Sequence, residues 1–417
     1  MKHILPFLLS SLLLTPLPAL AQETTGWEPL FLGWESEPAM DLGGRTVVSL
    51  QSLISRGIAG IRDMGERHPA VAPAWEFPVG AVLLLVQHEV DGHGGRGREF
   101  GLGPSYGFGY DLSAYTTTDR PPGTNEEGSL LAAGGTEATG VMAHRVLLDL
   151  LRPDGADGAK VPLAMIAKLD LTLYIASTAR PGRPGSGDAD DFLEQLEEGN
   201  DIAYWLASRQ SQRLGGDPAD VWFGLYEVDL DDPLLERTWE DARATALWNL
   251  LDPSLVTAVV AYFREHVLRG EERVRMPVLR IAEGLGLTLG TRGALGPREV
   301  SRFLDLYAAT RQGVFTGYVR DLDSTFDRTY GLGAGVHGLR LGGRLDFGVF
   351  VDAWEEPDAR EGEPRDASGW NATVELNVRP HSRWGFASKL GVKSEGFLPG
   401  LPLADGAYVG LGATFNP

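Results

Sequence analysis

Apolar residues recur at helical spacing over the first two thirds of the chain. In residues 47–61 they fall at Leu50, Leu53, Ile54 and Ile58, which places them on one face of a helix. The same spacing predicts further helices over 79–93, 128–151, 161–179, 190–213, 233–251 and 253–268. Residues 101–124 are rich in Gly, Tyr, Thr and Pro, which predicts a long loop, and long loops are often functional.

The period changes from helical to two beyond about residue 275. Residues 297–310 still predict a helix, because Val300, Phe303, Leu304 and Tyr307 share a helical face. From residue 345 onward, apolar residues alternate with polar ones, which is typical of antiparallel strands with one buried face. Gly342 and Gly343 suit the turn of a hairpin because both can adopt a positive φ.

The pattern therefore predicts an α+β fold with two parts. A mainly helical domain covers residues 22–275, and an antiparallel β-sheet or partial barrel covers residues 276–417. On the strand that contains residues 372–378, we expect Val374 and Leu376 to be buried and Glu375 and Asn377 to face water or a lumen.

The first 21 residues have the features of a secretory signal peptide. Lys2 precedes an apolar stretch from Ile4 to Leu14, and Ala19-Leu20-Ala21 forms a small-x-small cleavage pattern before Gln22. The apolar stretch is too short for a membrane anchor. We therefore expect an exported protein, located in the periplasm, at the outer membrane or outside the cell.

Composition limits both the partners and the metal ligands. The formal net charge is −20, which disfavours nucleic acid as a partner. Much of the acid lies in residues 188–201 and 227–241, which we interpret as solvated helix faces and caps. The chain has no cysteine, so any metal must be held by His and carboxylate side chains.

The sequence His88-Glu89-Val90-Asp91-Gly92-His93 ends an apolar run. Positions five apart are separated by about 140° on a regular helix, so the two histidines could not bind one metal there. A local bulge near Gly92 that absorbs one residue would bring the imidazoles together. Glu89 would then face the open coordination position of the metal and could accept a proton from a bound water.

This motif resembles the HExxGH form of the zincin signature, which is found in the dipeptidyl peptidase III family. In zincins of the gluzincin type, a glutamate on a downstream helix supplies the third ligand. The resemblance therefore implies that His88, His93 and Glu137 hold Zn²⁺ and that Glu89 is the general base. Glu137 lies in a run of small residues that lets its helix approach another closely, and His144 is two turns further on the same face. The second motif of that family is not seen, so the resemblance covers the site alone.

Other polar residues near the motif have two interpretations each. Arg96 and Arg98 could orient the carboxylate of a substrate terminus or form salt bridges. Tyr106, Tyr110 and Tyr115 could stabilise an oxyanion, or they could pack within the loop. His144 suits a buried position behind the ligands better than ligation.

Three functions compete on these observations. The first is an exported zinc metallopeptidase that acts on a peptide or protein substrate. The second is an envelope protein with a structural zinc, in which a fourth protein ligand such as His144 closes the site. The third is an outer-membrane, β-barrel-associated protein whose carboxy-terminal strands form a lipid-facing barrel. Against it, about five or six strands are convincing, fewer than the eight of the smallest membrane barrels. The sequence does not indicate an oligomeric state.

Overall fold

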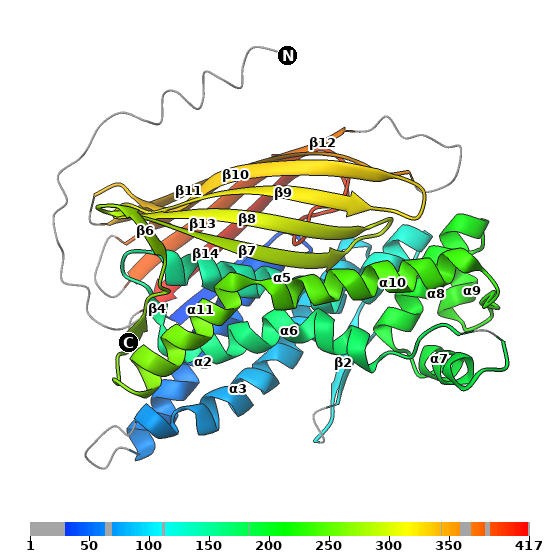
Figure 1. Cartoon of the computed structure of the whole chain (residues 1–417), viewed down its shortest axis with the longest axis horizontal. Helices are drawn as coiled ribbons and strands as arrows, with labels where there is room; N and C mark the ends of the chain where they lie inside the picture. The colour runs from blue at the N-terminus through cyan, green and yellow to red at the C-terminus, as the bar shows by residue number, and fades with distance from the viewer. Residues whose placement is uncertain are drawn as a thin grey trace.

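The computed structural model describes residues 30–62, 69–110, 113–182, 184–342, 344–358, 368–379 and 384–415. A layer of helices lies beneath one large antiparallel sheet (Figure 1). This confirms the predicted α+β class, with helices in the first part of the chain and strands in the last. The predicted signal peptide and its cleavage point before Gln22 lie outside the described residues.

The helices follow the predicted order, with shifted ends. The long helix α5 (Asn125–Leu151) runs under the sheet, and Thr124 caps its first turn by accepting a hydrogen bond from the Glu127 backbone. The region predicted as one helix over 190–213 is two helices, because Gly199 and Asn200 end the first and cap the second. The other helices that matter here are α2 (Met40–Arg62), α3 (Pro73–Val86), the π-helix η2 (Gln87–His93), α4 (Gly94–Glu99), α6 (Val161–Ser177), α7 (Gly187–Glu197), α8 (Asp201–Leu214), α9 (Pro218–Trp222), α10 (Pro233–Trp248), α11 (Pro253–Ala261) and the π-helix η5 (Tyr262–Val267).

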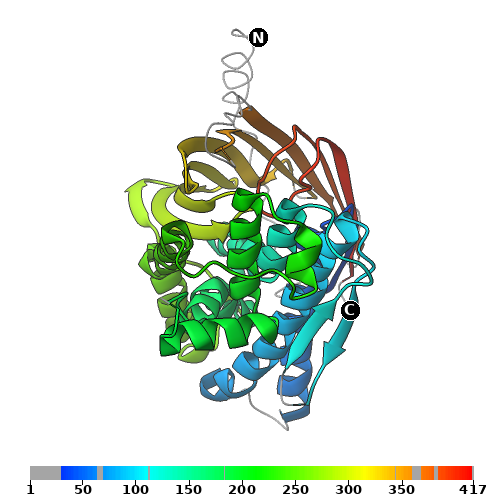
Figure 2. The same ribbon diagram turned by 90° about the vertical axis from the view of Figure 1, so that its right-hand side faces the viewer.

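The large sheet is antiparallel throughout, in the order β1-β14-β13-β12-β11-β10-β9-β8-β7-β6. Its first member, β1, comes from the start of the described chain and pairs with the last strand, so the sheet joins the two ends of the described chain. The strands are β1 (Leu30–Glu35), β6 (Leu279–Ala282), β7 (Leu285–Leu295), β8 (Val300–Thr310), β9 (Val314–Asp323), β10 (Arg328–Arg340), β11 (Leu345–Glu355), β12 (Ser368–Val378), β13 (Trp384–Lys393) and β14 (Gly406–Phe415). Figure 2 shows the sheet arched over the helices.

Two local predictions were wrong. Residues 297–310 do not form a helix, because Val300–Thr310 is strand β8. Its inward residues include Phe303 and Tyr307 and its outward ones include Leu304, so both faces carry large apolar residues and the period was ambiguous. The predicted loop over 101–124 contains a hairpin of β2 (Ser105–Phe108) and β3 (Ala114–Thr117). The predicted hairpin at Gly342 is present, with Leu341 bonded to Leu345, while Gly343 lies outside the described residues.

The predicted facing of the sheet was also wrong. Glu375 is buried against the helices, where both of its carboxylate oxygens accept hydrogen bonds from Arg145 at 2.8 Å. Val374, which was expected in the core, is 42% exposed on the other face. The alternation of period two was read correctly, but the charged face is the inner one and the apolar face is the outer one.

The helical region has an ordinary apolar core. One cluster includes Val47, Met142, Val146, Leu163 and Tyr262, and joins α2, α5, α6 and η5. A second cluster includes Phe192, Ile202, Trp205 and Trp239, and joins α7, α8 and α10. Within the described ranges no single helix is long and apolar enough to cross a membrane, although the bent pair Pro233–Leu251 and Pro253–Val267 meets that test of length and composition together.

Candidate metal centre

The two histidines of the motif lie side by side on a π-helix. Residues Gln87–His93 form η2, in which hydrogen bonds join residues five apart instead of four. The imidazole rings of His88 and His93 are 4.9 Å apart between centroids, and both side chains are buried. The prediction that a local bulge brings these two residues together is confirmed.

Glycines make room for this bulge against α5. A β-carbon on Gly92 would lie 2.6 Å from the carbonyl oxygen of Gly134, and one on Gly135 would lie 2.2 Å from Nε2 of His88. No side chain fits at either distance, so η2 and α5 meet backbone to backbone. The small residues of α5 thus have the packing role predicted for them.

One ring nitrogen of each histidine is held by the protein. Nδ1 of His88 lies 2.8 Å from Oδ2 of Asp170 on α6, and Thr139 donates to the same oxygen at 2.8 Å. Nδ1 of His93 lies 2.6 Å from the backbone oxygen of Leu131 on α5. An acceptor at Nδ1 keeps the proton there and leaves the lone pair of Nε2 free for a metal.

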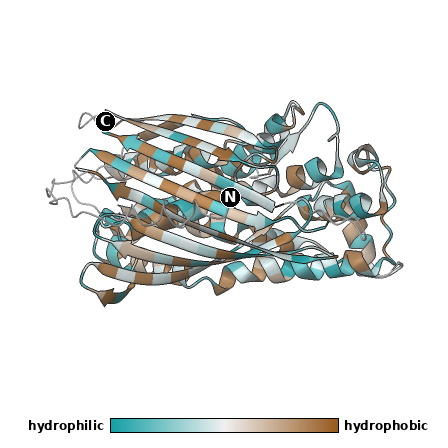
Figure 3. Ribbon diagram, turned by 90° about the horizontal axis from the view of Figure 1, so that it is seen from above, coloured by the Kyte–Doolittle hydropathy of each residue, from teal (hydrophilic) through white to brown (hydrophobic). Residues whose placement is uncertain are grey.

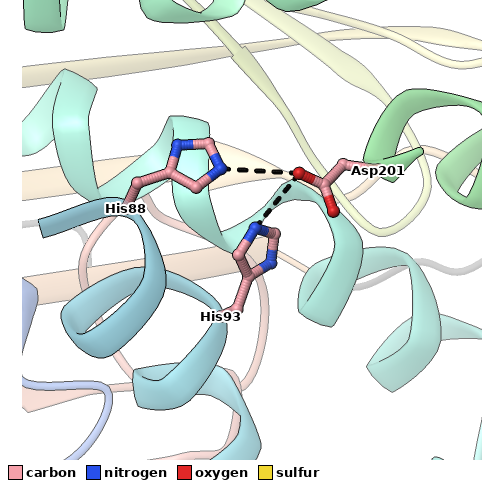
Figure 4. Close-up of side chains that lie close together, drawn as sticks. All are labelled: His88, His93 and Asp201. Carbon is pink, nitrogen blue, oxygen red and sulfur yellow. Dashed lines mark hydrogen bonds and ion pairs between the residues drawn. The ribbon is translucent and has the colours of Figure 1, made fainter. Parts of the chain in front are cut away.

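Asp201 completes a group of three candidate ligands. Its Oδ2 lies 3.4 Å from Nε2 of His88 and 3.2 Å from Nε2 of His93 (Figure 4). All three candidate ligand atoms lie within 4.8 Å of one another, so they could hold a metal ion. Asp201 begins α8, directly after the Asn200 cap, and its side chain is 23% exposed.

Sequence reasoning missed Asp201 because it ends the acidic segment 188–201, which was interpreted as a solvated helix face. The signal that could have found it is the break at Gly199-Asn200, because a residue in the first turn of a buried helix points into the protein. Neighbouring Ile202 and Ala203 are fully buried.

Glu137 does not lie with the histidines, so its predicted role as third ligand needs correction. Its Oε2 accepts a hydrogen bond from Nε of Arg96 at 2.9 Å, and its Oε1 accepts one from the backbone N–H of Gly400 at 2.7 Å and also binds Nη2 of Arg96. Arg96 is fully buried and also pairs with Glu99. This is a structural ion pair that ties α4 and α5 to the loop before β14, and it takes up the glutamate oxygens.

Glu89, the predicted base, is buried beside the cluster. Thr116 on β3 donates to its Oε2 at 2.7 Å and to its backbone oxygen at 3.1 Å. Burial lowers the pKa of His93, but the charge of Asp201 outweighs this and raises it. The carboxylate of Glu89 is close enough to the ligands to contribute to this rise. The hairpin of β2 and β3 therefore holds both the side chain and the backbone of this glutamate.

The remaining predicted residues lie away from the ligand atoms. His144 faces the sheet, with Nδ1 3.3 Å from the hydroxyl of Tyr307. Arg98 forms a half-exposed salt bridge with Glu37 at 2.8 Å and also donates to the hydroxyl of Tyr106. The salt-bridge interpretation of both arginines is therefore the one that the geometry supports. Tyr110 and Tyr115 are exposed near the tip of the hairpin.

The electrostatics of the cluster match a cation site. Burial lowers the pKa of His88, but Asp170 and Asp201 outweigh it and the net pKa lies well above 6.5. Burial likewise raises the pKa of Asp201, and the two histidines reverse this and hold it below its usual range. Tyr174 stacks on His88 at 4.8 Å between centroids and covers the ring. Two carboxylates thus draw positive charge to this position.

No protein-family model, no curated protein and no solved structure matches the chain.

Proposed function

We propose that this protein is a metal-dependent hydrolase, with Zn²⁺ as the metal and peptide bonds as the substrate class. The observation that carries the proposal is the convergence of one carboxylate oxygen with two Nε2 atoms, each on an imidazole whose Nδ1 is held by a hydrogen bond. Ligand atoms about 2.0–2.1 Å from a tetrahedral zinc are about 3.3 Å apart. The distances from Asp201 to the two imidazoles, 3.2 and 3.4 Å, fit that geometry.

The number of candidate ligands favours catalysis over a structural metal. Structural zinc sites are closed by four protein ligands, while catalytic sites keep a position for water. Among the described residues, the group contains three ligands only, and His144, the candidate for closing it, is bound to Tyr307 instead. Zinc would polarise the substrate carbonyl, and Glu89 would accept a proton from the attacking water.

Metal content tests the ligand assignment. Asp201→Asn should bind zinc at least tenfold more weakly than the parent protein, because it loses the only charged ligand of the three. Glu137→Gln is the matched control, because it changes the residue that the sequence suggested and leaves the cluster intact. Competition with a chelating dye measures both affinities. Full affinity in Asp201→Asn together with weak binding in Glu137→Gln would refute the cluster.

Activity tests the reaction. Glu89→Gln keeps the shape of the side chain and can still accept the hydrogen bond from Thr116, but it cannot take a proton. Peptidase activity on a mixed peptide library should fall about 10²–10⁴-fold with zinc affinity unchanged. Equal activity in both proteins would rule out Glu89 as the base. Zinc binding without activity in either protein would favour the structural site.

A further inference from the structure

The outward face of the sheet is a continuous apolar surface. On β13 the outward residues Trp384, Phe386, Leu390 and Val392 are exposed, and the residues between them, such as Lys389, are buried. Leu390 pairs with Val374 and then Val349, and Leu332 pairs with Val319 and then Leu304. These rows cross the sheet, and Figure 3 looks onto this face with the helices behind it. We name the outward side chains of β1 and of β7–β14 the apolar belt.

The side of the sheet that faces the helices carries the charges. Lys389 bonds to Glu35 at 2.6 Å and Asp41 at 3.1 Å, and Arg292 bonds to Asp305 through two 2.8 Å contacts. A cavity of about 190 Å³ lies between these groups and α5. An antiparallel sheet with one face in water has its polar face outward. Here the order is inverted, as it is where strands face lipid outside and polar groups inside.

Helix side chains cover parts of the two hydrogen-bonding edges of the sheet. At β1, the N–H groups of Phe31 and Gly33 donate to Ser49 and Thr46 of α2, at 3.0 and 3.3 Å. At the other edge β6 pairs with only the first residues of β7, and further along β7 Gly293 donates to Asn249 at 2.9 Å and the carbonyl of Thr291 receives Lys168. Unpaired backbone groups are costly in hydrocarbon, so these bonds lower the cost of placing the covered parts of the edges there.

The ends of the belt differ from its middle. At one end Trp384 and Phe415 are in contact at 4.6 Å between ring centroids, and at the other end Trp370 and Tyr330 are about half exposed. Between these aromatic ends the outward residues are mainly Leu and Val. From Trp384 to Val392 the belt is about 27 Å tall at ~3.4 Å per residue, close to the ~25 Å band of membrane strands with aromatic girdles. Charged residues such as Arg328 and Asp321 lie beyond the belt.

We infer that the apolar belt contacts the hydrocarbon layer of a lipid bilayer. A belt about 27 Å tall that crosses strands ~4.8 Å apart from β1 to β7 covers roughly 1,100 Å², against about 300–600 Å² for the largest patch of a typical monomer. Because the sheet arches outward (Figure 2), a second copy would touch only part of it, whereas lipid conforms to a convex face. The surface also continues past β7 onto α11 and η5, where Val256, Val260 and Phe263 are exposed.

This inference places the metal centre near one end of the belt. Gly400, in the connection between β13 and β14, bonds to Glu137 of α5. The residues of α5 that touch the histidines, Leu131 and Gly135, lie further toward its N-terminus. The cluster is therefore at the end of the sheet where β13 and β14 connect, and water can reach it there when the belt is in lipid. The inference does not depend on the proposed hydrolysis.

Site-directed spin labelling tests the contact with lipid, and the absence of native cysteine makes it direct. Leu390→Cys, Leu332→Cys and Val319→Cys would each carry a nitroxide in the protein reconstituted into phosphatidylcholine–phosphatidylglycerol vesicles. Collision with oxygen should exceed collision with a water-soluble nickel chelate at all three positions. Leu225→Cys, which is 69% exposed in the loop after α9, is the matched control and should show the reverse.

Two results would overturn the inference. Dominant collision with nickel at the belt positions would mean that the face is in water. Protection from both reagents, with a dimer by light scattering, would mean that a second copy covers it. Flotation with vesicles gives an independent measurement: Leu390→Arg should lower partitioning about 30-fold or more, as an arginine at mid-bilayer depth does, while Leu225→Arg should not. Equal flotation of both variants would also contradict lipid contact.

Discussion

The helical region and the inner face of the sheet both have apolar clusters, but they differ in how they bury charged residues. In the helical region, the clusters around Val146 and Trp205 are apolar, and the buried charged groups include those that converge at His88 and His93. In the sheet, Glu375, Lys389 and Asp305 are buried and Leu390 is exposed. The comparison teaches that a charged residue is buried where another residue binds it, and that the apolar residues of a strand lie on the outer face when its charged residues have their partners inside.

The two regions also use their buried charges differently. In the sheet the charges neutralise one another in pairs, as Arg145 does with Glu375. At the metal centre, Asp170 and Asp201 face two imidazoles that are neutral at high pH, so the group has room for a cation. Charges that neutralise one another stabilise the fold, whereas an excess of negative charge can bind a cation. The predictions below test this contrast, from the largest expected effect to the smallest.

The largest effect should come from breaking a pair in the sheet. Arg145→Met leaves Glu375 buried without its partner, which costs about 3–5 kcal/mol of unfolding free energy. Urea unfolding followed by tryptophan fluorescence measures this cost. Arg180→Met is the control, because Arg180 pairs with Glu236 on the surface, where a pair contributes about 0–1 kcal/mol.

A double variant sharpens the result. Arg145→Met with Glu375→Leu removes both charges and should recover most of the loss, since apolar replacements of a buried pair are often neutral. If the single variant were as stable as the parent protein, the inner face would be hydrated enough to hold an unpaired carboxylate, and the contrast between the two regions would fail.

The periods of the elements could be predicted from the sequence, but the environment of the sheet could not. Alternation at Leu345–Val351 or Ala372–Val378 indicates a strand with two unlike faces, and the structure confirms the strands. Which face turns inward depends on Arg145, which is 230 positions from Glu375 along the chain. Nothing local to the strand indicates that partner, and the prediction used the usual rule that apolar faces are buried.

The candidate site could be predicted in part for the same reason. His88, Glu89 and His93 are neighbours, so their spacing and Gly92 were enough to predict a bulge, and η2 confirms it. The candidate third ligand, Asp201, lies on a distant helix, whereas the sequence led to Glu137 for this role. Glu137 is bound by Arg96, and Asp201 is not taken by an arginine. The sequence does not show which acid has a competing partner.

The second prediction concerns the imbalance of charge at the metal centre. Asp170→Asn removes the negative charge behind His88 and should weaken zinc binding about 10–100-fold, as loss of a group behind a metal-bound histidine does. Asp191→Asn, an exposed acid on α7, is the control. Unchanged affinity in Asp170→Asn would mean that Asp170 only packs against the ring.

The pH dependence of zinc affinity is a second measurement on the Asp170→Asn variant. Zinc and protons compete for Nε2, and the pKa values of both histidines are raised above 6.5 in the metal-free protein. Affinity should therefore fall as pH falls, and it should still be rising with pH above 6.5. The raised pKa values also stabilise the metal-free fold fully below the unfolded imidazole pKa, and this contribution is lost as pH rises through the folded values. In Asp170→Asn the pKa of His88 should be lower. The pH dependence of zinc affinity and that of the stability of the metal-free protein should therefore both move to lower pH.

The smallest effect should come from the hairpin that holds Glu89. Thr116→Val removes the hydroxyl that donates to Oε2 of Glu89 but keeps the size and branching of the side chain. A hydrogen bond of this kind contributes about 1 kcal/mol, so peptidase activity should fall about fivefold if the bond orients the base in the transition state. Zinc affinity should stay the same, because the ligands are untouched. Thr117→Val, one position along on the other face of the hairpin, should leave both properties unchanged. A loss of zinc in Thr116→Val would show instead that the hairpin supports the whole cluster, and that the base and the ligands form one structural unit.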